Sequence, residues 1–188
     1  MATIDLIVLG MLKKQPLSAY DIQKLVEYRN ISKWVKISTP SIYKKVIQLE
    51  EKGLLQSVLV RENNMPEKAV YSLTDSGEQE FERLMRELSA QPIRMFLDFN
   101  AVIVNLDSVP SEMQKTCVAN IEKNVRELKM YLEENLREKG NMPDVPEIGM
   151  AVLRQQLVLA EMIETWISSL KSEFFEAFFR KRNVETLT

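Results

Sequence analysis

The sequence contains no histidine and a single cysteine, Cys117. Histidine is the commonest general base near neutral pH, and thiolate or imidazole groups dominate zinc sites. The 5 glycines are scattered along the chain and form no phosphate-binding loop. The usual parts of an enzyme and of a metal centre are therefore missing, and we expect no catalytic residue, no metal ion and no cofactor.

The chain also lacks a long apolar run and the cysteines that a disulfide needs. A transmembrane helix requires about 18 consecutive apolar residues, and no stretch approaches that length. The first apolar segment carries Asp5 and no small-residue cleavage site follows it, which argues against a secretory signal peptide. Cys117 lies on an apolar helical seam, so a buried, inert thiol in a reducing compartment is expected. These features predict a cytoplasmic protein without a membrane partner.

The net charge of −2 conceals an uneven distribution along the 188 residues. Residues 1–73 contain 11 Lys and Arg against 7 Asp and Glu, which gives +4, so the remainder carries −6. A basic first half favours contact with a polyanion through that half alone. Chance scatter of charge is the alternative for so small a difference.

The basic half contains a helix, a strand, a turn and a second strand in that order. Thr39 and Pro40 are typical of a helix start, and Gly53 is typical of a helix end. Residues 54–61 and 69–73 alternate between apolar and polar side chains as strands do. This order is that of a winged helix-turn-helix, in which one helix reads DNA and the hairpin forms a wing.

The outward face of that helix is polar and basic. Lysines and hydroxyl groups contact phosphates, while Gln and Lys also reach base edges in the major groove. A preceding helix, capped by Ser18 and Asp21, adds to the same surface. The residues predicted to contact DNA are Tyr20, Lys24, Lys36, Thr39, Ser41, Tyr43, Lys44, Lys45, Gln48, Arg61 and Lys68. A solvated helix face is the alternative explanation of this pattern, because charged outer faces are the rule.

Beyond Gln91 and Pro92 the sequence predicts helices and no strand. Apolar residues recur at steps of three or four over a long helix and again over the last helix, as in helices that pair. The predicted dimerisation residues are Ile121, Val125, Leu128, Leu132, Val152, Leu159, Ile163, Trp166, Leu170 and Phe174. The predicted fold is therefore mainly α with a small β-wing. It comprises a winged helix-turn-helix at 1–90 and an antiparallel, coiled-coil-like helical dimerisation domain at 91–188.

Two aromatic residues of the helical half, Phe96 and Phe99, are candidates for an effector pocket. Aromatic side chains at helical spacing more often pack in a core or an interface, which is the favoured alternative.

Five motifs carry a resemblance to a known family over roughly residues 4–85. They are LGML around Gly10, PLSAYDI at 16–22, SIY at 41–43, LEEKGLL at 49–55 and YSLTDSG at 71–77. In order and spacing they resemble the PadR family of bacterial transcriptional regulators, and the chain length resembles its larger branch. The resemblance implies a homodimeric winged-helix protein that binds two-fold operator DNA, often as a repressor relieved by a small molecule. By position, Tyr20, Ser41 and Tyr43 match residues of the family motif. The resemblance also implies Trp34 as a third candidate for an effector pocket, because a tryptophan lines such a pocket in some relatives. Packing in the core between the second and third helices is the favoured alternative for Trp34.

The wing departs from that family's pattern. Residues 62–68 lack the usual Gly-Arg and carry Glu62 and Glu67, which leaves Arg61 and Lys68 as the cations of the wing. An acidic wing keeps open a second hypothesis, a winged-helix protein-interaction module that does not bind DNA.

Overall fold

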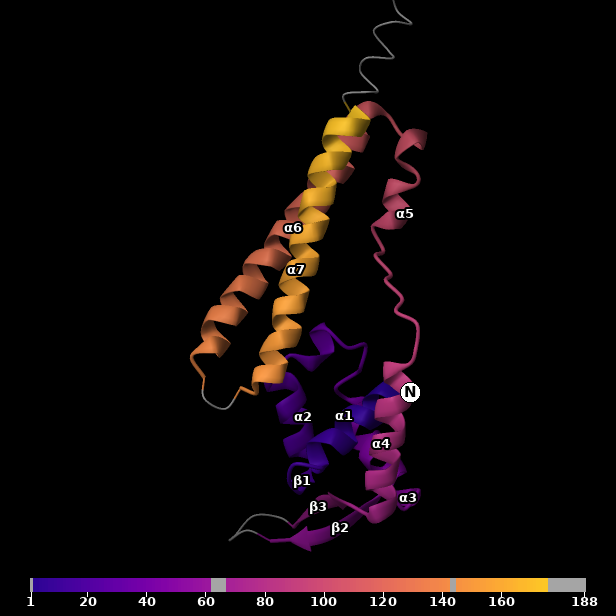
Figure 1. The fold of residues 1–188 in the computed structure, drawn as a ribbon, viewed down its shortest axis with the longest axis vertical. Helices are drawn as coiled ribbons and strands as arrows, with labels where there is room; N and C mark the ends of the chain where they lie inside the picture. Colours follow the sequence, from indigo (N-terminus) through magenta and orange to yellow (C-terminus); the bar gives the residue numbers. More distant parts are fainter. Residues whose placement is uncertain (1, 62–66, 143–144, 176–188) are drawn as a thin grey trace, which may run out of the picture. The chain divides into compact units, whose positions relative to one another are not determined.

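The computed structural model describes residues 2–61, 67–142 and 145–175, without the side chains of the last two (Figure 1). It divides into two compact units, residues 1–94 and 95–188, which are described separately. The first unit contains α1 (Ala2–Leu12), β1 (Leu17–Ser18), α2 (Ala19–Tyr28), η1 (Ile31–Lys33), α3 (Ser41–Glu51), β2 (Leu55–Val60), β3 (Lys68–Leu73) and α4 (Asp75–Ser89). The second contains α5 (Asn100–Ile103), η2 (Leu106–Ser108), α6 (Ser111–Gly140), α7 (Glu147–Leu170) and η3 (Lys171–Phe175).

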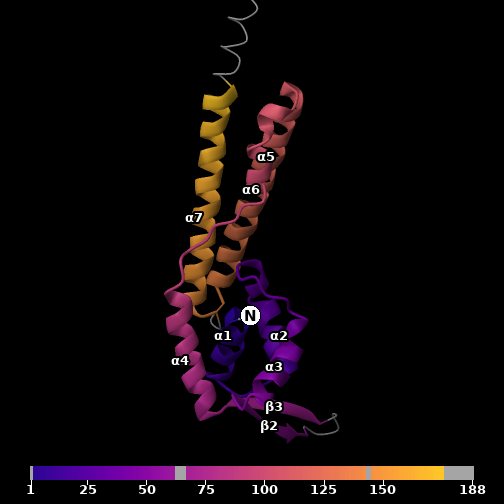
Figure 2. The same cartoon turned by 90° about the vertical axis from the view of Figure 1, so that its right-hand side faces the viewer.

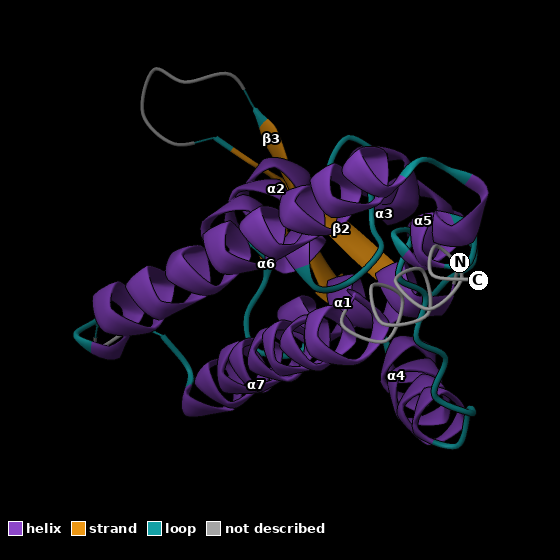
Figure 3. Ribbon diagram, turned by 90° about the horizontal axis from the view of Figure 1, so that it is seen from above, coloured by secondary structure: helices purple, strands orange, loops and turns teal. Residues whose placement is uncertain are grey.

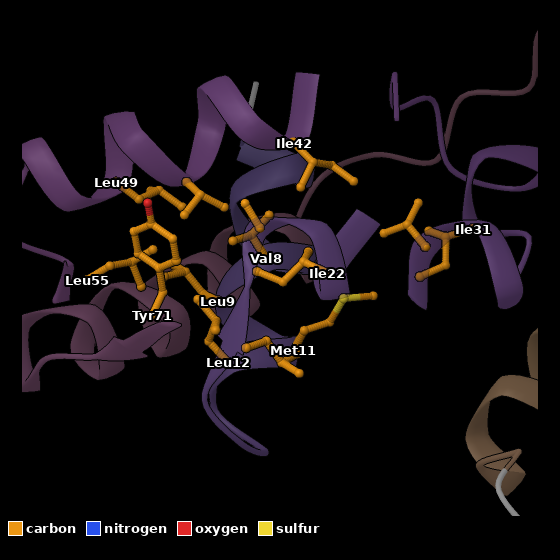
Figure 4. Close-up of a cluster of buried hydrophobic side chains, with 14 of the residues drawn as sticks. Val8, Leu9, Met11, Leu12, Ile22, Ile31, Ile42, Leu49, Leu55 and Tyr71 are labelled. Atoms are coloured by element: carbon orange, nitrogen blue, oxygen red, sulfur yellow. The ribbon is translucent and has the colours of Figure 1, made fainter. Parts of the chain in front are cut away.

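The core of the first unit forms where three helices meet the sheet. Val8 of α1, Ile22 of α2 and Ile42 of α3 are fully buried there (Figure 4). Val46 and Leu49 complete the apolar side of α3, which faces the core. Burying such side chains stabilises the unit by about 1.5–3 kcal/mol each, and it leaves the opposite side of α3 to solvent.

The sheet has three antiparallel strands in the order β1-β3-β2. β2 and β3 form the predicted hairpin, with Leu55 opposite Leu73 and Val60 opposite Lys68 (Figure 3). β1 was not predicted, because two residues are too few to show an alternating pattern. It exists through the pairing of Leu17 with Tyr71.

Local signals set the start of α2 and the end of α3 where the sequence predicted them. Ser18 and Asp21 form a capping box at the start of α2. At the end of α3, Gly53 has a φ of 70°, a left-handed conformation that suits glycine. Thr74 caps α4: its Oγ1 accepts from the N–H of Gly77 at 3.1 Å and donates to the carbonyl oxygen of Gly53 at 2.7 Å. This pair of bonds joins the start of α4 to the end of α3.

The second unit is built on the antiparallel packing of α6 against α7 (Figures 1 and 2). Its core cluster includes Ile121 and Val125 of α6 with Ile167 of α7. Leu132 is buried in the same unit. Their prediction as contacts to a second chain is corrected, because Ile121, Val125 and Leu132 are already buried within their own chain. No helix in the described ranges is both long enough and apolar enough to cross a membrane.

Candidate nucleic-acid interface

The exposed side of α3 is the centre of the candidate interface. Tyr43 and Lys44 are exposed, while Ser41 and Gln48 are half-buried toward the edges of this face. α3 packs on α2 and on β2, so its apolar side is held against the core (Figure 2). A helix fixed in this way presents polar side chains outward without having to fold on contact with a partner.

Ile47 is a member of this face that the sequence prediction omitted. It is 47% exposed, although it is aliphatic and lies on the helix whose other apolar residues are buried. Helical residues rotate by about 100° each, which places Ile47 between Tyr43 and Lys44 and away from Leu49. The signal available in the sequence was that Ile47 does not share the helix face of Ile42, Val46 and Leu49.

The prediction that Lys45 faces outward is wrong. Lys45 is buried, and its Nζ lies 2.8 Å from Oδ1 of Asp5 in α1. The position lies on the inner side of α3 next to Val46, where a lysine requires a negative partner. Lys45 therefore joins α3 to α1 and is removed from the candidate DNA contacts.

The exposed side of α2 adds a tyrosine and a lysine to the surface. Tyr20 and Lys24 are both exposed, and the Lys24 ammonium lies 5.5 Å from the centroid of the Tyr20 ring. A hydrogen bond to Glu27, at 3.3 Å, and the charge of that carboxylate raise the pKa of Lys24 above its ordinary value. Lys24 thus stays protonated, and a phosphate would compete with Glu27 for it.

The connector before α3 differs in detail from the prediction. Lys36 is exposed and Thr39 is half-buried. The helix begins at Ser41 with Pro40 as its N-cap residue, which makes no side-chain cap hydrogen bond. Instead, the Ser41 hydroxyl donates to the carbonyl oxygen of Ser38 at 2.5 Å. The predicted start of α3, with Thr39 as N-cap and Pro40 as first helical residue, was therefore one residue early.

The root of the wing holds its two predicted cations. Arg61 is exposed just after β2, and Lys68 is half-buried at the start of β3. The acidic wing prediction falls partly on residues 62–66, which lie outside the described residues. Beside this root, the Ser57 hydroxyl of β2 donates to Glu50 Oε1 of α3 at 2.6 Å, so the hairpin is tied to the candidate reading helix.

The remaining predicted dimerisation residues differ in exposure. Leu128 of α6 and Trp166 of α7 are exposed. The other predicted dimerisation residues of α7 are half-buried; they are Val152, Leu159, Ile163 and Leu170. The side chain of Phe174 lies outside the described part of the structure.

The three effector-pocket candidates occur in different units. Trp34 packs against the core of the first unit and is half-buried, as a core side chain would be. In the second unit, Phe96 is exposed, while Phe99 stacks on Trp166 with ring centroids 5.9 Å apart. Among the described residues, no group of three Cys, Asp or Glu side chains could hold a metal ion.

Comparison with known proteins finds a matching family model and several similar solved structures. Residues 8–83 match the model of the "Transcriptional regulator PadR-like family". The chain is similar to Bacillus subtilis PadR in complex with operator DNA, with a TM-score of 0.76 and 22% identity over 89% of this chain and 97% of that chain. It is also similar to the Vibrio cholerae virulence activator AphA, with a TM-score of 0.69 and 20% identity over 93% and 99% of the two chains. Bacillus subtilis PadR in complex with p-coumaric acid gives a TM-score of 0.72 and 20% identity over 90% and 93%. No curated protein sequence matches the chain.

The winged helix-turn-helix and the family match together define a DNA-binding transcriptional regulator. Within that class, residues 8–83 are similar to the PadR-like family. The predicted resemblance and fold class are thereby confirmed. The family is one of regulators and not of enzymes, in agreement with the sequence prediction.

Proposed function

We propose that this protein binds a specific DNA sequence by placing α3 in the major groove. The observation that carries the proposal is the exposed face of α3, where Tyr43, Lys44 and Gln48 project from a helix whose other side is buried. Lys44 and Gln48 are the candidate base contacts, because both side chains can hydrogen-bond to base edges. The similarity to a PadR that was crystallised with operator DNA supports this role for α3.

The remaining candidates surround α3 and carry hydroxyl or cationic groups suited to phosphates. They are Tyr20, Lys24, Lys36, Thr39, Ser41, Arg61 and Lys68. Such contacts set the position of a protein on the duplex, while base contacts supply its specificity. In this proposal residues 1–90 bind DNA in the cytoplasm and residues 91–188 pair two chains.

Salt-dependent binding tests the proposal directly. The protein is titrated against the DNA upstream of its own gene and against a scrambled duplex of equal composition, at several salt concentrations. We expect tighter binding to the upstream duplex, with log K falling against log salt by about 0.9 for each phosphate neutralised. Absence of binding to either duplex at low salt would overturn the proposal.

A protein-interaction module without DNA binding is the second candidate. It is favoured by Val58 and Leu59 of the edge strand β2, which are 66% and 69% exposed. An exposed apolar edge strand can pair with an extended peptide. A failed DNA titration together with retained partner binding by β2 would select this candidate.

The proposed homodimer uses the apolar surface that one chain leaves uncovered on α7. Val158, Met162 and Trp166 are 53%, 60% and 40% exposed, and they follow one another at steps of four residues. Residues at that spacing lie on one face of a helix. Covering this stripe with the same stripe of a second chain removes apolar area from water, which favours a two-fold dimer.

Sedimentation velocity at micromolar concentration tests the dimer. Met162→Lys should release monomers, because it places a charge in the stripe without entering the core of the chain. Ser168→Lys is the matched control: Ser168 is exposed on α7 but lies about 120° from Met162 around the helix. A monomeric wild type, or equal effects of the two variants, would contradict the proposed interface.

Two-fold symmetry of the protein demands two-fold symmetry of its operator. Half-sites should lie about one helical turn of DNA apart, or a multiple of it. We propose that occupancy of such an operator represses transcription, which deletion of the gene alongside a promoter reporter tests. Lower reporter output after deletion would instead identify an activator.

A small-molecule effector completes the proposed function. Aromatic carboxylic acids are the first class to test, because p-coumaric acid is bound in a similar PadR structure. Binding near Trp34 or near the Phe99–Trp166 stack should change tryptophan fluorescence and release the operator duplex. A fluorescence change without release would identify a ligand that does not regulate.

A further inference from the structure

Ile47 occupies the middle of the exposed face of α3, where the structure leaves an aliphatic side chain uncovered. Tyr43 lies on one side of it and Lys44 on the other, and both are exposed. An isoleucine that stays exposed to water forgoes part of the free energy that its burial would contribute. Single exposed apolar residues are common on protein surfaces, so the exposure alone carries no conclusion. The informative observation is that Ile47 lies at the centre of the α3 face that we propose reads DNA.

We propose that Ile47 reads the C5-methyl group of a thymine, an assignment that rests on the proposed function of α3. The thymine methyl is the one apolar group that base pairs present in the major groove. An isoleucine has no hydrogen-bonding group, so against a G·C pair it would cover polar base edges without bonding to them. Uncompensated desolvation of such groups is unfavourable. Ile47 therefore selects an A·T pair at the centre of the α3 footprint.

The helix around Ile47 holds this side chain in a fixed place. Leu54 N–H bonds to the carbonyl oxygen of Leu49 at 3.0 Å, and Gly53 N–H bonds to that of Glu50 at 2.8 Å, which closes the end of α3. The ion pair of Lys45 with Asp5 anchors its inner side. A β-branched side chain in a helix also has one strongly preferred χ1 rotamer. Contact with a methyl group therefore costs little further conformational entropy.

Removal of single methyl groups from the DNA tests the proposal. A duplex selected from a randomised pool for tight binding is resynthesised with each thymine in turn replaced by uracil, which removes only the C5-methyl. For the wild type we expect one thymine position in each half-site at which replacement weakens binding about fourfold, the equivalent of about 0.8 kcal/mol for one methyl. Ile47→Ala should weaken binding to the thymine duplex and lose sensitivity to uracil at that position alone.

Two variants serve as controls for the uracil scan. Ile47→Val should retain sensitivity at the same position. Met85→Ala removes an exposed apolar side chain from α4 instead of α3 and should leave the whole scan unchanged. If Ile47→Ala shows the same uracil profile as the wild type, the assignment of Ile47 is overturned while the proposed function stands. If no duplex can be selected at low salt, the proposed function itself fails, and Ile47 loses its role with it.

Discussion

Lys45 of α3 and Asp5 of α1 form a largely buried ion pair across 40 residues of sequence. The two atoms Nζ and Oδ1 are 2.8 Å apart, and the side chains are only 10% and 16% exposed. Through this pair the helix that carries the candidate DNA contacts is joined to the first helix of the chain. The ion pair also explains why one of two adjacent lysines is unavailable to DNA.

Asp5→Asn should destabilise the first unit by about 3 kcal/mol, because it leaves the Lys45 ammonium buried without its charged partner. Asp5→Leu combined with Lys45→Met should cost far less, since buried pairs replaced by apolar residues are often close to neutral. Urea dependence of hydrogen exchange at the amides of α1 and α3 measures both changes. Equal destabilisation by the single and double variants would show that the two charges are not coupled.

Lys44 and Lys45 should differ in their contribution to DNA binding. Lys44→Met should flatten the dependence of log K on log salt by about 0.9, the share of one phosphate contact, if its ammonium reaches the backbone as well as a base. The double variant Asp5→Leu, Lys45→Met should keep the wild-type slope. Fluorescence anisotropy at four salt concentrations distinguishes them, and a flatter slope in the double variant would contradict the buried position of Lys45.

Two candidate contacts on different helices should have different effects. Lys24→Ala should weaken binding to all sequences alike and lower the salt slope by about one contact. Gln48→Ala should relax discrimination at one base pair, at a cost of about 1–3 kcal/mol for a bidentate contact. Titrations with operator and scrambled duplexes compare the two variants. Equal loss of affinity for both duplexes in Gln48→Ala would mean that α3 docks on DNA without reading it.

Gly77→Ala should destabilise the first unit by about 3 kcal/mol or more, the upper part of the range for overpacking. An added Cβ would lie 2.0 Å from the carbonyl oxygen of Leu54, and backbone cannot move aside as a flexible side chain can. Gly149→Ala in α7 is the matched control, because a Cβ there meets nothing within 4 Å. It should be neutral or stabilising by up to about 1 kcal/mol. Thermal unfolding of the two variants measures these changes in stability. An unchanged stability in Gly77→Ala would contradict the close approach of α4 to the backbone of Leu54.

The stability of the second unit should depend on Glu122 at acid pH. A hydrogen bond from Lys171, at 2.9 Å, and the charges of Lys171 and Arg126 lower the pKa of Glu122 below its ordinary value of 4.5. A lowered pKa in the folded state stabilises it above the ordinary value, and this stabilisation is lost as the pH falls through the folded-state pKa. Glu122→Gln should therefore cost about 0.5–1 kcal/mol at pH 7 and little at pH 3.

Unfolding of the second unit at pH 7 and pH 3 measures that difference. Glu127→Gln is a suitable control, because Glu127 is more exposed and its partner Lys123 lies 3.7 Å away. A pH-independent cost for Glu122→Gln would show that the side chain acts through packing and not through its charge.

Features set by neighbours in the sequence could be predicted from the sequence alone. The capping box of Ser18 with Asp21, the helix end at Gly53 and the start of α4 at Thr74 each depend on residues within a few positions of one another. The order of helix, strand, turn and strand follows from such signals, and that order determined the winged helix-turn-helix. The apolar spacing of α3 likewise determined which of its sides faces the core.

Features that join distant segments were decided by the tertiary structure. Nothing near Lys45 in the sequence indicates that Asp5 will neutralise it, and β1 exists only through its pairing with β3. In the second unit, spacing shows which residues share a face of a helix but not what covers that face. Ile121 and Val125 are buried where α6 packs on α7, whereas Val158, Met162 and Trp166 of α7 stay exposed. Burial depends on which surfaces meet in space, and the period of one helix contains no information about its neighbour.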